Sequence, residues 1–268
     1  MALYWHPFLA QMLRLSYADR LIVQEQVSLG DLPLQADLLL IRRDPSLALP
    51  YPLEFLGART LVEFKSPDDT ADQAALEQLE IYGLLYVRRE QLPRRSDLTL
   101  WLMASNIAAN VSQPGRTELT RVQDVGPGVR RGTHDGFPTL QLDLQAVPFS
   151  PDTIPLHMVA GGRQERALVE YIIEHYKHYP HQLDLLASLH GFALMEALIM
   201  HNLTPEQIGI DFDALSKIIR PEHFLKHHSL EAILDEWAKR HGTEKVREWL
   251  ERKGGQSPDA SQPGPSKN

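Results

Sequence analysis

The chain has 268 residues, enough for one large domain or two small ones. Hydrophobic residues make up 43% and charged residues 23%, as in globular proteins that bury a sizeable core. The absence of cysteine excludes disulfides, zinc–thiolate sites and thiol catalysis, and a net charge of −8 argues against strong nonspecific binding to nucleic acid.

The N-terminus lacks the pattern of a signal peptide, and no apolar run reaches the roughly 18 residues of a membrane span. We therefore expect a cytoplasmic protein with no membrane contact.

Two elements are predicted at the start of the chain. Residues 1–17 form a helix with an apolar stripe near the 3.6-residue period, and residues 20–29 form a strand. Glu25 falls among the apolar residues of that strand. It is either a supplementary carboxylate of a site or a solvated residue in an imperfect alternation.

A second strand is predicted over residues 34–41, joined to the first by a hairpin at Gly30-Asp31. Asp37 lies inside this apolar run. An aspartate there is costly to bury unless another group pairs with it.

A third strand, Leu61 to Lys65, stops at Pro67. Side chains alternate along a strand, so Glu63 and Lys65 share one face while Val62 and Phe64 share the other. If this strand pairs with the Asp37 strand, two carboxylates converge from backbones about 5 Å apart. A divalent cation relieves such repulsion, and oxygen ligands suit Mg2+ or Mn2+. The alternative is a solvated strand pair with an incidental ion pair.

A helix follows over residues 71–87. Thr70 and Gln73 fit a capping box at its start. Gln78 and Tyr82 are four residues apart and therefore share a face of this helix. A tyrosine at that spacing is also a common core residue, so the pair alone does not assign a function.

Three further segments complete the first 150 residues. The nearly continuous apolar run 97–105 predicts a buried strand that follows the helix as a crossover partner. Residues 112–138 are rich in Gly, Pro and Arg and predict an irregular excursion with an edge strand at 117–122. Residues 139–147 alternate as another strand.

Four arginine pairs stand in the first half of the chain. They are Arg42-Arg43, Arg88-Arg89, Arg94-Arg95 and Arg130-Arg131. These pairs either line a basic rim that contacts the phosphates of a nucleic acid or are ordinary surface charges.

The second half of the chain has a different character. Residues 151–162 predict a linker and residues 163–253 a helical region, with helices at 163–179 and 182–202 and new starts at Thr204, Ser229 and Thr243. The polar tail 254–268 predicts disorder. The C-terminal helices are expected to bind a protein partner, form a homodimer or select the substrate.

Histidines in this region raise the question of a metal site. They are His175, His178, His181, His223, His227 and His228. No carboxylate has the spacing of H-E-x-x-H, so we interpret them as surface or interface residues.

The order Asp37, Glu63-x-Lys65, Gln78-x-x-x-Tyr82 resembles the PD-(D/E)xK nuclease superfamily, and its helix is similar to the RecB-like and recombination-promoting, transposase-like members. The matching residues lie within about the first 105 positions. About 25 residues separate Asp37 from Glu63, longer than the hairpin often found there. The resemblance implies an α/β restriction-endonuclease-like core over residues 1–150, a mixed central sheet flanked by helices, with a C-terminal all-α extension.

The resemblance also implies a chemistry. Asp37, Glu63 and the backbone carbonyl of Phe64, with Glu25 as a further candidate, would hold Mg2+ or Mn2+. Lys65 would stabilise charge on the scissile phosphate, with Gln78 and Tyr82 supporting it. The expected function is a metal-dependent DNA endonuclease in recombination or mobile-element processing.

Two other functions are consistent with the sequence. One is a catalytically inactive member of the same fold that serves as a binding or assembly module. The other is a non-enzymatic α/β scaffold whose charged strand residues decorate its surface. Burial of the charged residues separates these interpretations.

Overall fold

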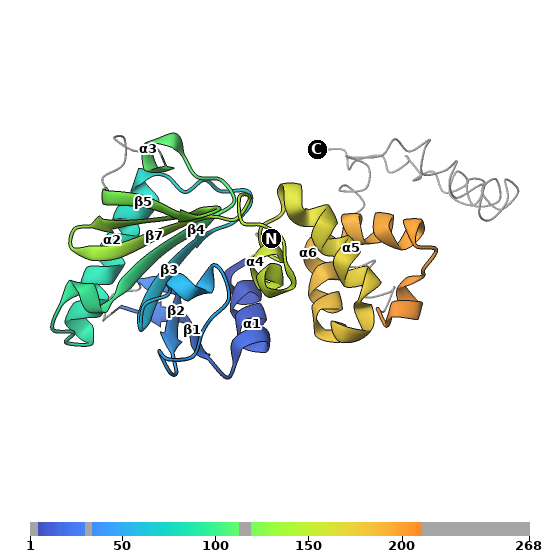
Figure 1. Cartoon of the computed structure of the whole chain (residues 1–268), viewed down its shortest axis with the longest axis horizontal. Helices are drawn as coiled ribbons and strands as arrows, with labels where there is room; N and C mark the ends of the chain where they lie inside the picture. The colour runs from blue at the N-terminus through green and yellow to red at the C-terminus, as the bar shows by residue number, and fades with distance from the viewer. Residues whose placement is uncertain (1–4, 30–33, 113–118, 211–268) are drawn as a thin grey trace, which may run out of the picture. The chain divides into compact units, whose positions relative to one another are not determined.

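The computed structural model describes residues 5–29, 34–112 and 119–210, which all belong to the first of the two units into which the chain divides, residues 1–215 (Figure 1). In chain order the elements, with η for a 3-10 helix, are α1 (Trp5–Tyr17), β1 (Leu21–Ser28), β2 (Gln35–Arg42), η1 (Leu53–Phe55), β3 (Arg59–Lys65), α2 (Gln73–Arg89), η2 (Arg95–Asp97), β4 (Thr99–Ala104), α3 (Ala109–Ser112), β5 (Thr120–Gly126), β6 (Val129–His134), β7 (Phe137–Asp143), η3 (Pro151–Thr153), α4 (Ile154–His157), η4 (Gly162–Gln164), α5 (Glu165–Glu174), η5 (Tyr176–His178), α6 (Pro180–Met200) and η6 (Pro205–Ile208).

The described strands form one mixed sheet of seven, in the order β1-β2-β3-β4-β7-β6-β5. β3, β4 and β7 run parallel at its centre, and the flanking pairs are antiparallel. Helix α2 makes the crossover from β3 to β4, as the sequence predicts. The α/β class, with a mixed sheet flanked by helices, is confirmed.

Two hydrophobic clusters cover the two faces of this sheet. Val62, Phe64 and Trp101 pack in the cluster that contains α1 and α4. Leu61 and Leu100 pack in the cluster that contains α2. The alternation predicted for β3 is therefore confirmed, and Glu63 and Lys65 belong to the α2 face.

The segment 112–138 is more regular than predicted. Residues 120–126 and 129–134 form the antiparallel strands β5 and β6, joined at Pro127-Gly128. Gly128 has a positive φ of 77°, and a Cβ there would lie 2.6 Å from the carbonyl oxygen of Asp143, so the turn requires glycine. The edge strand predicted at 117–122 overlaps β5, which lies at the edge of the sheet, whereas β6 was not indicated by the sequence. The prediction of an irregular excursion was wrong for residues 123–134, and the predicted edge strand is confirmed at residues 120–122.

The start of α2 also differs from the prediction. The first helical residue is Gln73, and the N-cap is Asp72, whose carboxylate accepts a hydrogen bond from the Ala75 backbone N–H at 3.0 Å. The capping box of Thr70 and Gln73 does not form. Asp is preferred over Thr as an N-cap residue, and this preference outweighs the capping-box spacing of Thr70 and Gln73.

The predicted linker 151–162 is built into the α/β core. Leu156, Val159 and Ala160 are at most 1% exposed and lie in the α1-side cluster. The Tyr17 hydroxyl donates to the carbonyl of Asp152 at 2.6 Å, which ties η3 to α1. The predicted boundaries between domain, linker and helical region stay predictions.

Helices continue over residues 165–208. Pro180 is the first residue of α6, and α6 is interrupted at His190, whose φ of −127° is not helical. In the part of the chain that the structure describes, no single helix is long and apolar enough to span a membrane, although the two halves of α6, bent by 113°, pass that test together. Gly30-Asp31, Ser229, Thr243 and the tail 254–268 lie outside the described residues.

Leu156→Ala tests whether the 151–162 segment belongs to the core. Leu156 is 1% exposed, so its truncation should lower the free energy of unfolding by about 2–5 kcal/mol. Chemical denaturation measures this value. Leu47→Ala, at a leucine that is 43% exposed, is the matched control and should cost less than about 1 kcal/mol. Equal losses in the two variants would mean that the segment is a loosely packed connection.

Candidate functional site

The site begins where β2 separates from β3. The antiparallel register pairs Leu40 with Thr60 and Leu38 with Val62, and one more step would place Asp37 opposite Glu63. The pairing stops before that step. The backbone N–H of Phe64 instead donates to the Asp37 carboxylate, with N and Oδ2 2.9 Å apart. This bond holds Asp37 beside β3 at the end of the ladder.

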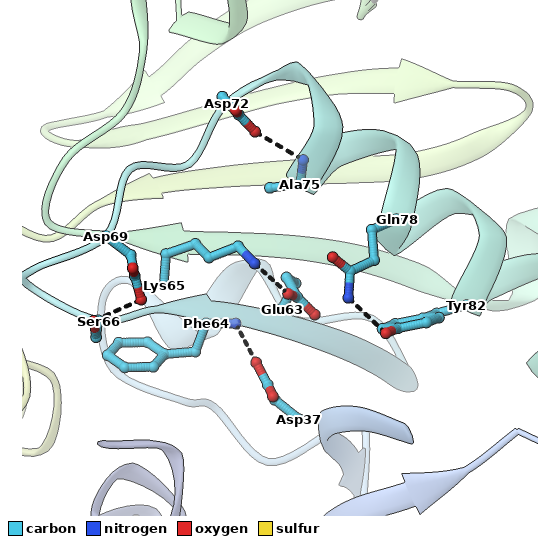
Figure 2. A network of polar contacts seen from close by, with 10 residues as sticks. All are labelled: Asp37, Glu63, Phe64, Lys65, Ser66, Asp69, Asp72, Ala75, Gln78 and Tyr82. Carbon is cyan, nitrogen blue, oxygen red and sulfur yellow. Dashed lines mark hydrogen bonds and ion pairs between the residues drawn. The ribbon is translucent and has the colours of Figure 1, made fainter. Parts of the chain in front are cut away.

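Glu63 and Lys65 form an ion pair on the α2 face of β3. Nζ of Lys65 lies 2.8 Å from Oε1 of Glu63 (Figure 2). The Glu63 side chain is 5% exposed and the Lys65 side chain 23%, so the carboxylate lies beneath the ammonium group. The predicted common face of these two residues is confirmed.

Burial dominates the electrostatics of the two carboxyl groups. Burial and the charge of Asp37 raise the pKa of Glu63 to about 7, although Lys65 lowers it. Burial also raises the pKa of Asp37, against the lowering effects of the Phe64 N–H, His6 and Lys65. Each group therefore holds its proton more tightly than in water, and a further positive charge nearby would favour both carboxylates.

Lys65 experiences opposite influences. Partial burial lowers its pKa, but the hydrogen bond and charge of Glu63, with Asp37 and Asp69, outweigh this and leave the pKa raised. Asp69 is held in the loop after β3 by the Ser66 hydroxyl, at 2.8 Å. Lys65 therefore stays a cation among carboxylates.

The helix side of the site is supplied by α2, which packs against β3. The Gln78 amide N–H donates to the hydroxyl of Tyr82 at 2.5 Å, so the two residues share a helix face as predicted. Figure 2 shows the Gln78 side chain reaching from α2 toward the side of β3 that carries Glu63 and Lys65. No hydrogen bond joins Gln78 to Glu63 or Lys65 in the described structure. Tyr82 is 8% exposed and also packs in the α2-side cluster.

Glu25 does not join this site. Its carboxylate pairs with Arg14 of α1, and its cross-strand neighbour is Leu38, which packs in the α1-side cluster. The suggestion of a supplementary carboxylate was therefore wrong. The alternation along β1 is interrupted at Gln26, which has a positive φ of 47°.

Two polar residues near the site were missed as contributors. His6 of α1 lowers the pKa of Asp37, and Asp69 raises that of Lys65. Asp69 stands four positions after Lys65, a spacing that the sequence shows. The approach of His6 to Asp37 depends on how α1 packs, which the sequence alone does not give.

The donor set bears on a metal ion. Asp37 and Glu63 each use one oxygen in the contacts above, which leaves the second oxygen of each carboxylate without a protein partner among the described residues. Two carboxylates of raised pKa and a nearby backbone carbonyl fit a hard cation such as Mg2+ or Mn2+. No group of three or more His, Asp or Glu residues is arranged for a metal within residues 5–29, 34–112 and 119–210.

The histidines of the helical region have other contacts. His175 stacks on Tyr171, with ring centroids 4.4 Å apart, and its Nδ1 lies 2.9 Å from the Tyr171 carbonyl oxygen. His178 and His181 are exposed. His223, His227 and His228 lie outside the described residues.

Stability should depend on pH through Glu63. Its pKa is about 7 in the folded protein against 4.5 as the reference value, so its stabilising contribution is full below pH 4.5 and is lost as the pH rises through 7. The loss should be roughly 3–4 kcal/mol, because the pKa rises from 4.5 to about 7 and one pKa unit corresponds to about 1.4 kcal/mol. Urea denaturation in EDTA across this range measures it.

Glu63→Gln should flatten this pH dependence, since an amide does not titrate. Glu174→Gln, at an exposed residue of α5, is the control and should retain the wild-type slope. If Glu63→Gln also retained that slope, the carboxyl group of Glu63 would not be perturbed as described.

Comparison of the chain with protein-family models, with curated proteins and with solved structures gave no significant match to any of them.

Proposed function

We propose that this protein is a metal-dependent nuclease that hydrolyses DNA phosphodiester bonds. One observation carries the proposal: the buried carboxylate of Glu63 and the half-buried carboxylate of Asp37 lie close enough at the end of a strand pair to influence each other and the cation Lys65, which is paired with Glu63. Perturbed ionisable groups gathered in this way are characteristic of functional sites. The resemblance to PD-(D/E)xK nucleases in residue order supports the same conclusion.

Burial of this cluster weighs against a purely structural role. A buried ion pair is often no more stabilising than apolar residues of the same shape, so a scaffold would gain little from Glu63 and Lys65. The Glu63 side chain is 5% exposed, and surface decoration does not explain it. A catalytically inactive binding module remains the alternative that activity measurements decide.

Each residue has a proposed task. A divalent cation held by Asp37, Glu63 and the Phe64 carbonyl would lower the pKa of a bound water and polarise the phosphate. Lys65 has three N–H donors, so it keeps one on Glu63 while another reaches a phosphate oxygen. There it would stabilise the negative charge that grows in the transition state. Gln78 orients this arrangement from α2, and Tyr82 holds the Gln78 amide.

The arginine pairs contribute less to DNA binding than a free basic rim would. Arg42 and Arg43 donate to backbone carbonyls, and Arg95 and Arg130 pair with Asp135 and Asp124. With a net charge of −8, unaided binding to long duplex DNA is expected to be weak. Single-stranded, nicked and branched DNA belong in the assay for this reason.

Lys65→Ala tests the catalytic assignment. The purified protein with Mg2+ or Mn2+ should cleave DNA, EDTA should stop the reaction, and the variant should lose about 100-fold or more in kcat. Because Lys65 acts on charge that develops in the transition state, KM should change little. Lys177→Ala, which removes an exposed lysine of η5, is the matched control and should cleave as wild type. Equal rates for Lys65→Ala and wild type would refute the role of Lys65.

Metal binding should be visible without turnover. Mn2+ should raise the Tm of the protein in a concentration-dependent way, because the cation binds the folded state alone. Asp37→Asn keeps an acceptor for the Phe64 N–H but removes the charge, and should reduce the shift by at least about half. Asp19→Asn, at a side chain that is 72% exposed, should leave it unchanged. A Tm that ignores Mn2+ would contradict the metal site.

A further inference from the structure

A polar cavity of about 540 Å³ lies beyond the carboxyl ends of the three parallel strands. Pro67 and Thr70 form part of its wall from the loop after β3, Asn106 and Ile107 from the end of β4, and Asp143 from the end of β7. Ligands of open α/β sheets bind at this end of the strands, and the volume suits a small molecule or one nucleotide.

The strand register relates this cavity to the proposed catalytic site. Lys65 pairs with Ala104, and Ala104 pairs with Asp143, so the three residues form one row across the sheet. Two rows behind it, and on the same face of the sheet, lie Glu63, Leu102 and Gln141. Neighbouring strands are about 4.8 Å apart, so the backbones of Lys65 and Asp143 are separated by roughly 10 Å.

The chemistry of the lining disfavours a phosphate. Among the described residues that line the larger cavity there is no Lys or Arg, and Asp143 carries a carboxylate. The second cavity, described below, is lined by Arg130, whose charge is paired with Asp124. One oxygen of Asp143 accepts from the Gln145 backbone N–H at 2.9 Å. The other can accept a hydrogen bond from a ligand, with the apolar surfaces of Pro67 and Ile107 close by. A neutral, flat group with N–H donors fits this lining.

Gln141 provides an independent observation. A second cavity, of about 280 Å³, adjoins the first, since both are lined by Ile107 and Asp143, and Gln141 lines it as well. Gln141 is 2% exposed, and its amide N–H donates to the Val111 carbonyl at 3.0 Å. Its Oε1 has no hydrogen-bond partner among the described residues. A buried acceptor without a donor is costly, and less than 1 Å² of this oxygen is accessible. A rotation of the Gln141 amide toward the cavity, with an N–H group of a ligand as its donor, would relieve this cost.

We propose that this pair of cavities binds an unpaired nucleobase of the DNA strand whose phosphate lies at Lys65. The proposal rests on the nuclease function proposed above and adds a base-binding subsite to it. The base would donate N–H groups to Asp143 and Gln141, as flipped or single-stranded bases do in enzyme pockets. An unpaired base is required because a base stacked in a duplex exposes only its groove edges and cannot enter a cavity.

Equilibrium binding of modified oligonucleotides tests the subsite. The full chain in EDTA, where no cleavage occurs, is titrated with fluorescent single strands of about eight nucleotides, intact or with one base removed at each position in turn. Loss of the base that occupies the cavity should weaken binding about 10-fold, while the sugar-phosphate chain is unchanged. Fluorescence anisotropy measures the Kd.

Asp143→Asn distinguishes this subsite from contact elsewhere. Asn keeps an acceptor for the Gln145 N–H and presents an NH2 donor in place of the second oxygen. The variant should bind the intact strand about 10-fold more weakly and respond less than about twofold to base removal. Asp184→Asn, at an exposed residue of α6, makes the same change of charge and should behave as wild type.

Each remaining outcome decides the proposal. Equal sensitivity to base removal in wild type and Asp143→Asn, or no binding of the strands at all, would overturn the subsite. If the wild type cleaves DNA but Asp143→Asn does not reduce the sensitivity of binding to base removal, the nuclease function stands and the subsite is refuted. If Asp143→Asn does reduce that sensitivity but the wild type does not cleave DNA in Mn2+, the subsite stands and the nuclease function is refuted.

Discussion

The hydrogen bond from the Phe64 N–H to the Asp37 carboxylate brings Asp37 to the strand that carries Glu63 and Lys65. A buried backbone N–H needs an acceptor, and the β2–β3 ladder no longer supplies one beyond Leu38 and Val62. Asp37 takes that place. Its charge then lies close enough to Glu63 to raise the pKa of that residue, and Glu63 in turn holds Lys65. The site is therefore a product of strand separation as much as of the residues themselves.

The parallel centre of the sheet gives the site its surroundings. Because β3 and β4 are parallel neighbours, α2 connects them by crossing one face of the sheet. This is the face that carries Glu63 and Lys65, so Gln78 and Tyr82 of α2 lie over β3. The same parallel order places the end of β7 beside the end of β4, so Asp143 and Gln141 come into the same rows as Lys65 and Glu63. The proposed catalytic site and the polar cavity thus lie toward the same ends of the parallel strands.

Sequence alone predicted the parts of this arrangement that depend on local periodicity. Alternation along β3 gave the common face of Glu63 and Lys65, and helical spacing gave that of Gln78 and Tyr82. The face of Glu25 could not be predicted, because Gln26 has a positive φ and the neighbouring valines enter different clusters: Val23 lies on the α1 side and Val27 on the α2 side. The predicted edge strand at 117–122 covers only the start of β5, because β5 is exposed and carries little hydrophobic alternation, and β6 was missed because two arginines and a glycine interrupt its pattern.

Two backbone hydrogen bonds formed by the chain before α2 fix the rotation of this helix about its own axis. The Ala71 N–H donates to the Asn106 carbonyl at 2.8 Å, and the Ala108 N–H donates to the Ala71 carbonyl at 2.9 Å, so the chain before the helix is bound to the chain after β4. Each residue of an α-helix advances by about 100° around its axis. A slip of one residue at Ala71 would turn Gln78 away from β3 and bring Glu77 or Leu79 into its direction. Two backbone hydrogen bonds therefore select which side chain of α2 is presented to Glu63.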